Sequence, residues 1–183
     1  MATIRDDRRA FFKFGLVAAA GCISLPRAAR AAVEAGRHER RLAFYNLHTG
    51  ESFGSPYWIE GRYLPESLAE IDHVLRDFRT NQVKPIATSL LDLLFALRAT
   101  LSTESFHVIS GYRSPATNAM LAGNGSGVAR HSLHMAGEAI DIRLPGRDLR
   151  AVRSAAIALH GGGVGYYPKS NFIHMDVGRV RTW

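Results

Sequence analysis

Cysteine is almost absent from this chain, which has only Cys22 among its 183 residues. Cys22 lies in an amino-terminal segment that we expect to be removed, so the remaining domain would have no cysteine at all. This excludes disulfides, thiolate metal ligands and a cysteine nucleophile from that domain. Its fold must therefore rest on a hydrophobic core.

Long apolar runs are missing too. The run from Phe14 to Leu25 is shorter than the ~20 residues with which a helix spans a bilayer. Arg8 and Arg9 precede this run and small residues at 29 and 31 supply a cleavage site, which is the outline of a twin-arginine export signal. We therefore expect residues 1–31 to be a leader and residues 32–183 to be a periplasmic domain without a stable membrane span.

The leader departs from the usual twin-arginine pattern at two positions. Asp7 stands where serine or threonine is usual, and Phe12 stands where leucine is usual. An uncleaved membrane anchor is therefore an alternative. Lipidation at Cys22 is a weaker one, because Ala19 occupies the place where a lipoprotein has a large aliphatic residue.

A dense basic stripe, which is the usual mark of nucleic-acid binding, is also lacking. The six basic and two acidic side chains of the leader contribute +4 of the net charge of +7, which leaves +3 for the domain. So mild a charge gives no reason to expect a nucleic-acid partner. It suits an anionic cell-wall polymer as well or better.

The domain is long enough for one core and has no internal repeat or low-complexity tract. Apolar periodicity and turn residues predict its elements. Helices are expected at 65–78, 90–101, 115–121 and 148–159, and strands at 42–47, 51–57, 106–110, 139–143, 164–167 and 172–177. The glycines at 161–163 and 165 are followed by no Lys-Ser or Lys-Thr pair, so we expect a turn into a strand rather than a phosphate-binding loop. The prediction is an α+β fold, a small and mainly antiparallel sheet with helices packed on it.

Two short segments of this domain combine histidine with aspartate. Side chains alternate between the two faces of a strand, so His174 and Asp176 share one face while Ile173 and Met175 share the other. One face of this strand is thus suited to packing and the other to chemistry. Any single histidine is more often a structural residue, but the repeated pairing with aspartate favours a metal site.

The second segment supplies two more candidate ligands. Asp141 stands on the face opposite the apolar Ile140 and Ile142, and His134 must approach from the preceding loop. Gly137 lies between the two ligands, where a residue that tolerates unusual backbone angles allows the chain to turn into the strand.

Two imidazoles and one carboxylate are suitable ligands for zinc. Three protein ligands with one open position are typical of catalytic zinc, whereas structural zinc has four protein ligands. The sequence therefore predicts one Zn²⁺ per chain, bound by His134, Asp141 and His174 on the open face of the sheet. A purely structural metal is the less favoured alternative.

Four ordered motifs between residues 40 and 183 resemble the zinc D-alanyl-D-alanine carboxypeptidases and related murein endopeptidases. They are Ser110-Gly-Tyr-Arg-Ser-Pro115, Ser132-x-His-x-x-Gly-x-Ala-x-Asp141, Gly163-Val-Gly-Tyr-Tyr-Pro168 and Phe172-Ile-His-Met-Asp176. The short chain and its leader resemble the periplasmic endopeptidases of this group most. The resemblance implies the same three zinc ligands, and it implies that Arg113 binds substrate near the metal, a role that suits the donor fork of arginine. The alternative is that Arg113 only forms a surface salt bridge and has no role in substrate binding.

One departure from the family pattern concerns the general base. Many relatives have a histidine two residues before the last ligand or a glutamate three before, where this chain has Phe172 and Asn171. Asp176 is the nearest substitute, because it shares a strand face with His174 and a carboxylate can accept a proton from activated water. Asp176 could equally orient His174 from behind. His131 is a third candidate, for base or substrate contact.

The predicted activity is zinc-dependent hydrolysis of amide bonds in peptidoglycan stem-peptide cross-links. Tyr112, Tyr166 and Tyr167 are candidates for a substrate-binding wall, although aromatic residues near glycines more often serve packing. A D-alanyl-D-alanine carboxypeptidase and a non-catalytic module that binds peptidoglycan and keeps the metal remain as alternatives.

Overall fold

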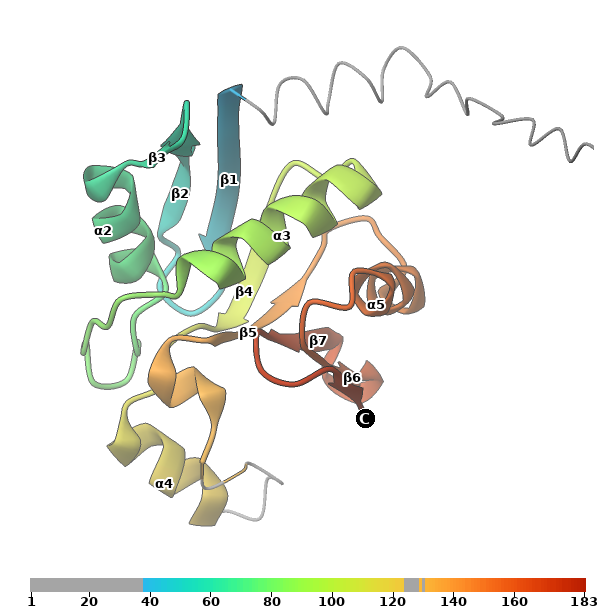
Figure 1. Cartoon of the computed structure of the whole chain (residues 1–183). Helices are drawn as coiled ribbons and strands as arrows, with labels where there is room; N and C mark the ends of the chain where they lie inside the picture. Colours follow the sequence, from blue (N-terminus) through green and yellow to red (C-terminus); the bar gives the residue numbers. More distant parts are fainter. Residues whose placement is uncertain (1–37, 124–128, 130) are drawn as a thin grey trace, which may run out of the picture.

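The computed structural model describes residues 38–123, 129 and 131–183 (Figure 1). The predicted leader, its cleavage site and Cys22 lie outside these residues. Among the residues described, no helix has the length and apolar content needed to cross a membrane.

A single mixed sheet of eight strands organises the fold, in the order β3-β2-β1-β4-β5-β7-β6-β8. The strands are β1 Glu39–Asn46, β2 Ser52–Ile59, β3 Arg62–Tyr63, β4 Phe106–Ser110, β5 Ala139–Arg143, β6 Gly163–Tyr167, β7 Phe172–Asp176 and β8 Arg181–Thr182. All pairs are antiparallel except β1 with β4 and β6 with β8. The α+β class and the mainly antiparallel sheet are confirmed, whereas the prediction of a small sheet was wrong. The strands β3 and β8 are too short to leave a periodic signal.

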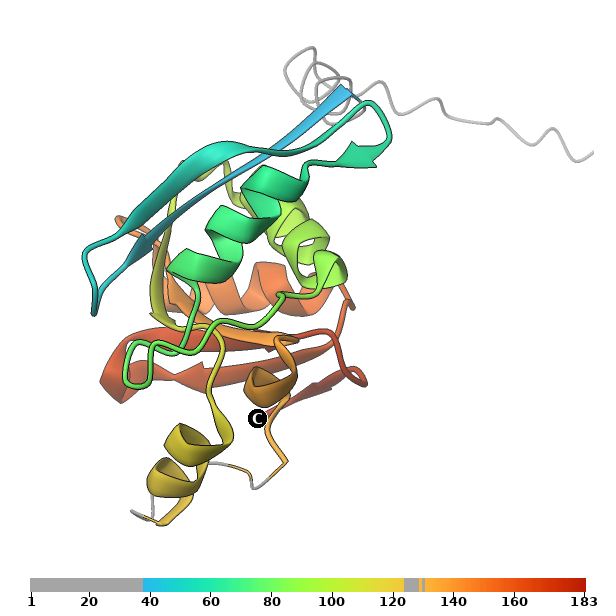
Figure 2. The ribbon, with the colours of Figure 1, turned by 90° about the vertical axis from the view of Figure 1, so that its left-hand side faces the viewer.

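Three helices, α2 Pro65–Val74, α3 Thr88–Leu101 and α5 Leu149–Ala158, pack against the sheet (Figures 1 and 2). The helix α3 contributes four fully buried leucines to the core, Leu90, Leu91, Leu94 and Leu97. Ile140 and Ile142 of β5 are buried in the same core. Because side chains alternate along a strand, Asp141 between them points to the opposite face. The core therefore fixes which face carries the polar residues.

The remaining helices lie away from the core layer. The helix α4, Pro115–Gly123, projects from one end of the molecule (Figure 2). A 3₁₀ turn, η1 Leu133–Ala136, stands where the sequence predicted a loop, and a second one, η2 Pro168–Ser170, joins β6 to β7. The turn η1 forms because the Ser132 side chain accepts a hydrogen bond from the His134 backbone amide at its start. It ends at Gly137, whose φ of 74° few other residues adopt.

Candidate metal centre

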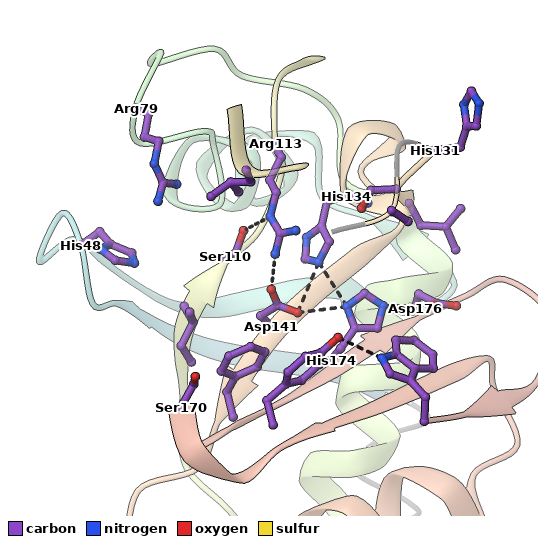
Figure 3. Close-up of a pocket in the computed structure, with 18 of the residues that line it drawn as sticks. His48, Arg79, Ser110, Arg113, His131, His134, Asp141, Ser170, His174 and Asp176 are labelled. Carbon is purple, nitrogen blue, oxygen red and sulfur yellow. Dashed lines mark hydrogen bonds and ion pairs between the residues drawn. The ribbon is translucent and has the colours of Figure 1, made fainter. Parts of the chain in front are cut away.

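Three elements bring the three predicted ligands together. His134 comes from η1, while Asp141 on β5 and His174 on β7 are directly paired in the antiparallel ladder. Their donor atoms form a small triangle (Figure 3). His134 Nε2 lies 3.2 Å from His174 Nδ1 and 3.3 Å from Asp141 Oδ1, and His174 Nδ1 lies 3.0 Å from the same oxygen.

The two imidazoles present different ring nitrogens to this triangle. His134 Nδ1 lies 2.7 Å from the Gly111 carbonyl oxygen, which can only accept, so Nδ1 carries the proton. His174 Nε2 lies 2.9 Å from an Asp176 oxygen and therefore carries the proton of that ring. His134 Nε2 and His174 Nδ1 are therefore unprotonated, and the lone pairs of both nitrogens point at the Asp141 oxygen Oδ1.

This donor set fits a metal ion. Ligand atoms about 2.0–2.1 Å from a tetrahedral zinc lie about 3.3 Å from one another, which matches the triangle. Each ligand atom lies within 4.8 Å of the other two, and all three residues are buried. Three converging lone pairs would repel one another without a cation between them, so these residues can hold one.

Electrostatics in the site favour a charged carboxylate. Burial alone would raise the pKa of Asp141, but His134, His174 and Arg113 outweigh it and hold this pKa far below its usual range. Burial lowers the pKa of His134. For His174 burial acts in the same direction, but hydrogen bonds to Asp141 and Asp176 outweigh it and raise its pKa.

The segment from Ser110 to Arg113 supports the centre from one side. The Arg113 Nε donates to Ser110 Oγ at 2.8 Å, and its Nη2 donates to the Asp141 oxygen Oδ2, while Oδ1 faces the histidines. The carbonyl of Gly111 binds His134. A Cβ at Gly111 would collide with the Leu75 carbonyl oxygen, so the chain requires glycine there. Arg113 is thus no surface salt bridge, and it lies beside the candidate ligands as predicted.

A buried aspartate from the segment after α2 anchors this support. Asp77 accepts a hydrogen bond from the Ser114 backbone amide at 2.8 Å and is 1% exposed. Burial opposes its charge, but bonds to Ser114 and Thr117 outweigh burial and lower its pKa to about 2. Asp77 therefore fixes the backbone immediately after Arg113.

Asp176 lies behind His174 rather than within the triangle (Figure 3). Its Oδ1 accepts from the amides of Gly163 and Gly178 at 3.0 and 2.9 Å, and Arg181 binds both of its oxygens. The carboxylate is fully buried. His174 and Arg181, followed by the two amides, outweigh burial and lower its pKa. Every contact of Asp176 suits an anion that holds the His174 ring in place.

The other predicted site residues lie farther from the centre. His131 is exposed at the pocket rim, and its ring points away from the ligands (Figure 3). The expectation that Tyr112 and Tyr166 line the pocket is wrong. Tyr112 is buried in the core, and Tyr166 lies under the Arg153 guanidinium, with 5.4 Å from Cζ to the ring centre. Strand alternation explains Tyr166, because it shares a face with the buried Val164.

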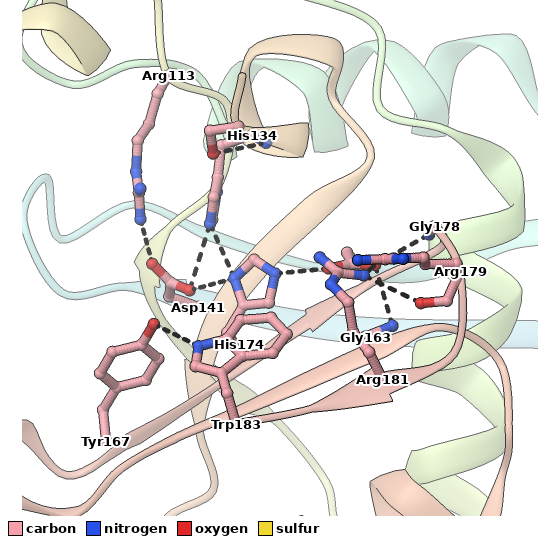
Figure 4. A network of polar contacts seen from close by, with 12 residues as sticks. Arg113, His134, Asp141, Gly163, Tyr167, His174, Gly178, Arg179, Arg181 and Trp183 are labelled. Carbon is pink, nitrogen blue, oxygen red and sulfur yellow. Dashed lines mark hydrogen bonds and ion pairs between the residues drawn. The ribbon is translucent and has the colours of Figure 1, made fainter. Parts of the chain in front are cut away.

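A pocket of about 530 Å³ opens over the centre, and its lining includes four arginine, histidine or tryptophan side chains that were not predicted from the sequence. Arg181 and Trp183 line one side, and His48 and Arg79 line another (Figures 3 and 4). Alternation along β6 places Tyr167 on the site face, where it does line the pocket. The other four come from a hairpin turn, a loop and the end of the chain, where no periodic pattern could have indicated them.

Comparisons with known proteins agree with this geometry. The Peptidase_M15_2 family model, described as peptidoglycan L,D-endopeptidase MepK, matches residues 34–183. The Escherichia coli K12 protein of that name is 42% identical over 178 residues, which cover 97% of each chain. A Haemophilus influenzae protein, named a probable peptidoglycan L,D-endopeptidase MepK, is 39% identical over 185 residues, covering 100% of this chain and 98% of that protein.

These matches extend over essentially the whole described domain, including every element that contributes to the metal centre. They confirm the resemblance to the zinc D-alanyl-D-alanine carboxypeptidase-like peptidases that the four motifs indicated. The chain is therefore a peptidase, and it belongs to the Peptidase_M15_2 family.

Proposed function

We propose that this protein is a zinc-dependent murein endopeptidase that hydrolyses amide bonds in peptidoglycan stem-peptide cross-links. One Zn²⁺ per chain would be held by His134, Asp141 and His174. The observation that carries the proposal is the convergence of two imidazole lone pairs on one carboxylate oxygen, at separations of 3.0–3.3 Å. The shared description of the relatives supports peptidoglycan as the substrate.

The name of the relatives also favours one bond among the candidates. In a cross-link between two diaminopimelate residues, the amide joins an L centre to a D centre. The bond from D-alanine to diaminopimelate and the terminal D-alanine bond join two D centres. We therefore propose the diaminopimelate-to-diaminopimelate cross-link as the substrate, and we place the carboxypeptidase activity second.

The residues of the centre have separate tasks in this proposal. When bound, zinc would supply a Lewis acid and lower the pKa of a bound water to about 7. Arg113 holds one oxygen of Asp141, so that the other faces the metal position, and its remaining donors can bind a substrate carboxylate or a developing oxyanion. Asp176 holds the proton of His174 Nε2 and so keeps Nδ1 free as a ligand.

Between the two roles considered for Asp176, its contacts favour orientation of His174. Both carboxylate oxygens already accept several hydrogen bonds, and the group is fully buried behind the ring. A general base needs to reach the proton that it removes. We therefore infer that Asp176 is a positioning residue.

Two further parts of the proposal concern location and the metal. We propose that residues 1–31 direct twin-arginine export and that the domain works in the periplasm, where its substrate lies. Three protein ligands would leave one coordination position open, which argues against a structural metal.

The decisive experiment uses purified protein and two muropeptide dimers, one cross-linked through two diaminopimelate residues and one through D-alanine. Mass spectrometry should detect cleavage of the first dimer, loss of cleavage on removal of metal, and recovery with Zn²⁺. His134→Ala should be inactive, while His107→Ala, which changes a histidine outside the pocket, should keep activity. Undiminished cleavage after chelation or by His134→Ala would refute the metal mechanism.

A further inference from the structure

The last residues of the chain reach into the metal centre from the sheet edge. Arg181 begins β8, which pairs in parallel with β6, and Trp183 follows directly after it. The Trp183 backbone is fixed at both polar groups, because its amide donates to Val164 at 3.2 Å and its carbonyl accepts from Tyr166 at 3.0 Å. We call Arg181 and Trp183 the β8 clamp.

Arg181 holds the carboxylate that holds His174. Its Nη1 donates to Asp176 Oδ1 at 3.0 Å and its Nη2 donates to Oδ2 at 2.7 Å, a two-pronged contact (Figure 4). The same Oδ2 accepts from His174 Nε2. A planar guanidinium bonded in this way fixes the orientation of the carboxylate as well as its charge.

Trp183 contacts the same histidine from the pocket side. The centres of the Trp183 and His174 rings lie 5.2 Å apart, and the Arg181 guanidinium lies 4.9 Å from the centre of the indole. The indole Nε1 donates to the Tyr167 hydroxyl at 2.9 Å, which fixes the ring (Figure 4). Trp183 is still 47% exposed and lines the pocket, so a substrate can contact it.

Two glycines of β6 create the space that the β8 clamp occupies. A Cβ at Gly165 would lie 2.7–2.9 Å from atoms of the Trp183 indole. A Cβ at Gly163 would collide with the Arg181 guanidinium and the Asp176 carboxylate. Glycine weakens a strand, so two of them in one short strand indicate a close approach. The sequence predicted a turn into this strand, which the structure confirms. The two glycines within the strand also allow arginine and tryptophan to lie against the sheet.

We propose that the β8 clamp positions the metal ligand His174, with Arg181 acting through Asp176 and Trp183 acting by ring contact, and that Trp183 also forms a wall against the substrate. This inference rests on the proposed function for the identity of the metal. Neither residue is among the three candidate ligands, so both are positioning residues toward the metal.

Zinc affinity tests the Arg181 half of the proposal without any activity measurement. Competition with a chelator should show that Arg181→Ala binds Zn²⁺ about 10–100-fold more weakly, the usual effect of losing a partner that orients a ligand. Arg181→Lys keeps the charge but not the two-pronged contact, so it should fall between. Arg179→Ala, whose side chain is exposed, is the control and should bind zinc like wild type. Wild-type affinity in both Arg181 variants would overturn the proposal.

A double-mutant cycle tests the Trp183 half. Trp183→Phe and Tyr167→Phe each remove the same hydrogen bond, so the double variant should lose no more zinc affinity than either single variant. Trp183→Ala should lose more affinity and should also raise KM, because the wall is gone. Thr182→Ala is the matched control, since Thr182 does not line the pocket. A Trp183→Ala protein with unchanged affinity and unchanged KM would refute this half. Should the protein fail to bind zinc at all, the proposed function itself fails.

His48 and Arg79 form another side of the pocket, away from the β8 clamp (Figure 3). Two carboxylates line the pocket, and Asp141 is paired with Arg113 while Asp176 is paired with Arg181. Arg79 also lines it, and no carboxylate partner for its guanidinium is found among the residues that the structure describes. A net positive charge therefore remains at this side of the pocket.

Packing holds this cation in place. The Arg79 guanidinium lies 4.2 Å from the centre of the Phe78 ring, and the His48 ring stacks on the same phenylalanine at 4.0 Å. Burial and the nearby charge of Arg79 lower the pKa of His48, so the imidazole is neutral at pH 7 and can act as a hydrogen-bonding partner. We propose that Arg79, assisted by His48, binds a carboxylate of the substrate peptide away from the scissile bond.

Amidated substrate tests this second proposal, which also rests on the proposed function. Wild type should cleave cross-linked muropeptides with free diaminopimelate carboxylates at least tenfold more efficiently than amidated ones, as expected for a charged hydrogen bond. Arg79→Gln should remove that preference by losing kcat/KM only on the free acid. Arg150→Gln, an exposed change on α5, should keep it. Equal cleavage of both substrates by wild type, or an equal loss on both in Arg79→Gln, would overturn the proposal. Failure to cleave either substrate would instead count against the proposed function.

Discussion

At the residue scale, the centre depends on the hydrogen-bond partner of each ring more than on the ligands alone. A main-chain carbonyl fixes the tautomer of His134, and a carboxylate fixes that of His174. Opposite ring nitrogens therefore face one point. Arg113 acts in the same way on Asp141, because it occupies one oxygen and leaves the other facing the two imidazoles.

Replacement of Arg113 by lysine tests this arrangement. Arg113→Lys keeps one positive charge but cannot bond Ser110 and Asp141 at once through a rigid fork. We expect a loss of about 10–100-fold in zinc affinity or kcat/KM, measured by chelator competition and by muropeptide cleavage. Arg143→Lys on β5, outside the pocket, should behave like wild type. Full activity in Arg113→Lys would show that charge alone suffices.

The sequence predicted which residues come together as candidate ligands, because alternation along two strands separates core from site residues. Asp141, His174 and Asp176 were placed on the correct strand faces for that reason. Alternation carries no information on contacts between distant segments. The hydrogen bond from His134 to the Gly111 carbonyl and the contact of Arg181 with Asp176 depend on how β4 and β8 meet the other strands.

At the element scale, buried polar anchors and tight turns determine where the ligands stand. The turn η1 is held against the loop before α3, because Ala87 donates its amide to the Gly137 carbonyl at 2.9 Å. Asp77 holds the start of α4 in the same way. Such anchors lie far apart in the sequence, so only the overall lengths and types of these elements could be predicted.

Gly137 offers a test of one such turn. Alanine at this position would be strained at a φ of 74° and would also collide with the Pro85 carbonyl oxygen. Gly146 has a φ of 70° and free space around it, so Gly146→Ala carries the backbone strain alone. We expect Gly146→Ala to lower the free energy of unfolding by about 1 kcal/mol and Gly137→Ala by clearly more. Denaturant unfolding compares the two, and equal losses would contradict the expected collision.

The lowered pKa of Asp77 leads to a prediction about the stability of the fold at low pH. Its pKa is lowered to about 2 in the folded protein from an ordinary value of 3.8, so its charge stabilises the fold above the ordinary value. This stabilisation is roughly 2 kcal/mol and is lost as the pH falls from about 4 towards 2. Asp77→Asn should therefore be less stable than wild type at pH 7 and show less additional loss between pH 4 and pH 2. Parallel stability curves for the two proteins would contradict the assignment.

At the scale of the whole molecule, one continuous sheet joins the two sides of the pocket. The turn after β1 and the loop after α2 supply His48 and Arg79. The strands β5 and β7 supply two candidate ligands, and β8 with the residue after it supplies the clamp. The sequence predicted the class and the main elements of this sheet. The sequence did not predict that the sheet has eight strands. The short edge strands and the two parallel pairs depend on tertiary contacts, which leave no local signal in the sequence.

Zinc should therefore stabilise the folded domain as a unit. An ion that binds only the native state at 100 times its Kd adds about 2.7 kcal/mol, or roughly 5–10 °C in Tm for a domain of this size. Thermal unfolding with and without Zn²⁺ measures this shift. His134→Ala should show none, and an equal shift in that variant would place the ion elsewhere.

The proposed twin-arginine export leads to a prediction for the chain that carries residues 1–31. Replacement of both Arg8 and Arg9 by lysine should retain the protein in the cytoplasm, because a twin-arginine signal requires the pair. Cell fractionation and immunoblotting would reveal the change. Periplasmic accumulation of the double-lysine variant would exclude this route.

The strand order finally has a consequence for the folding pathway. Phe44 of β1 pairs with Phe106 of β4 only after α2 and α3 have been crossed, whereas Asp141 pairs with His174 over a much shorter stretch of chain. Closing the longer loop costs more chain entropy before any stabilising contact forms. We expect pulsed hydrogen exchange to protect the amides of β5, β6 and β7 before the amides that join β1 to β4. The ligand-bearing half of the sheet would then act as the template on which the amino-terminal hairpin docks.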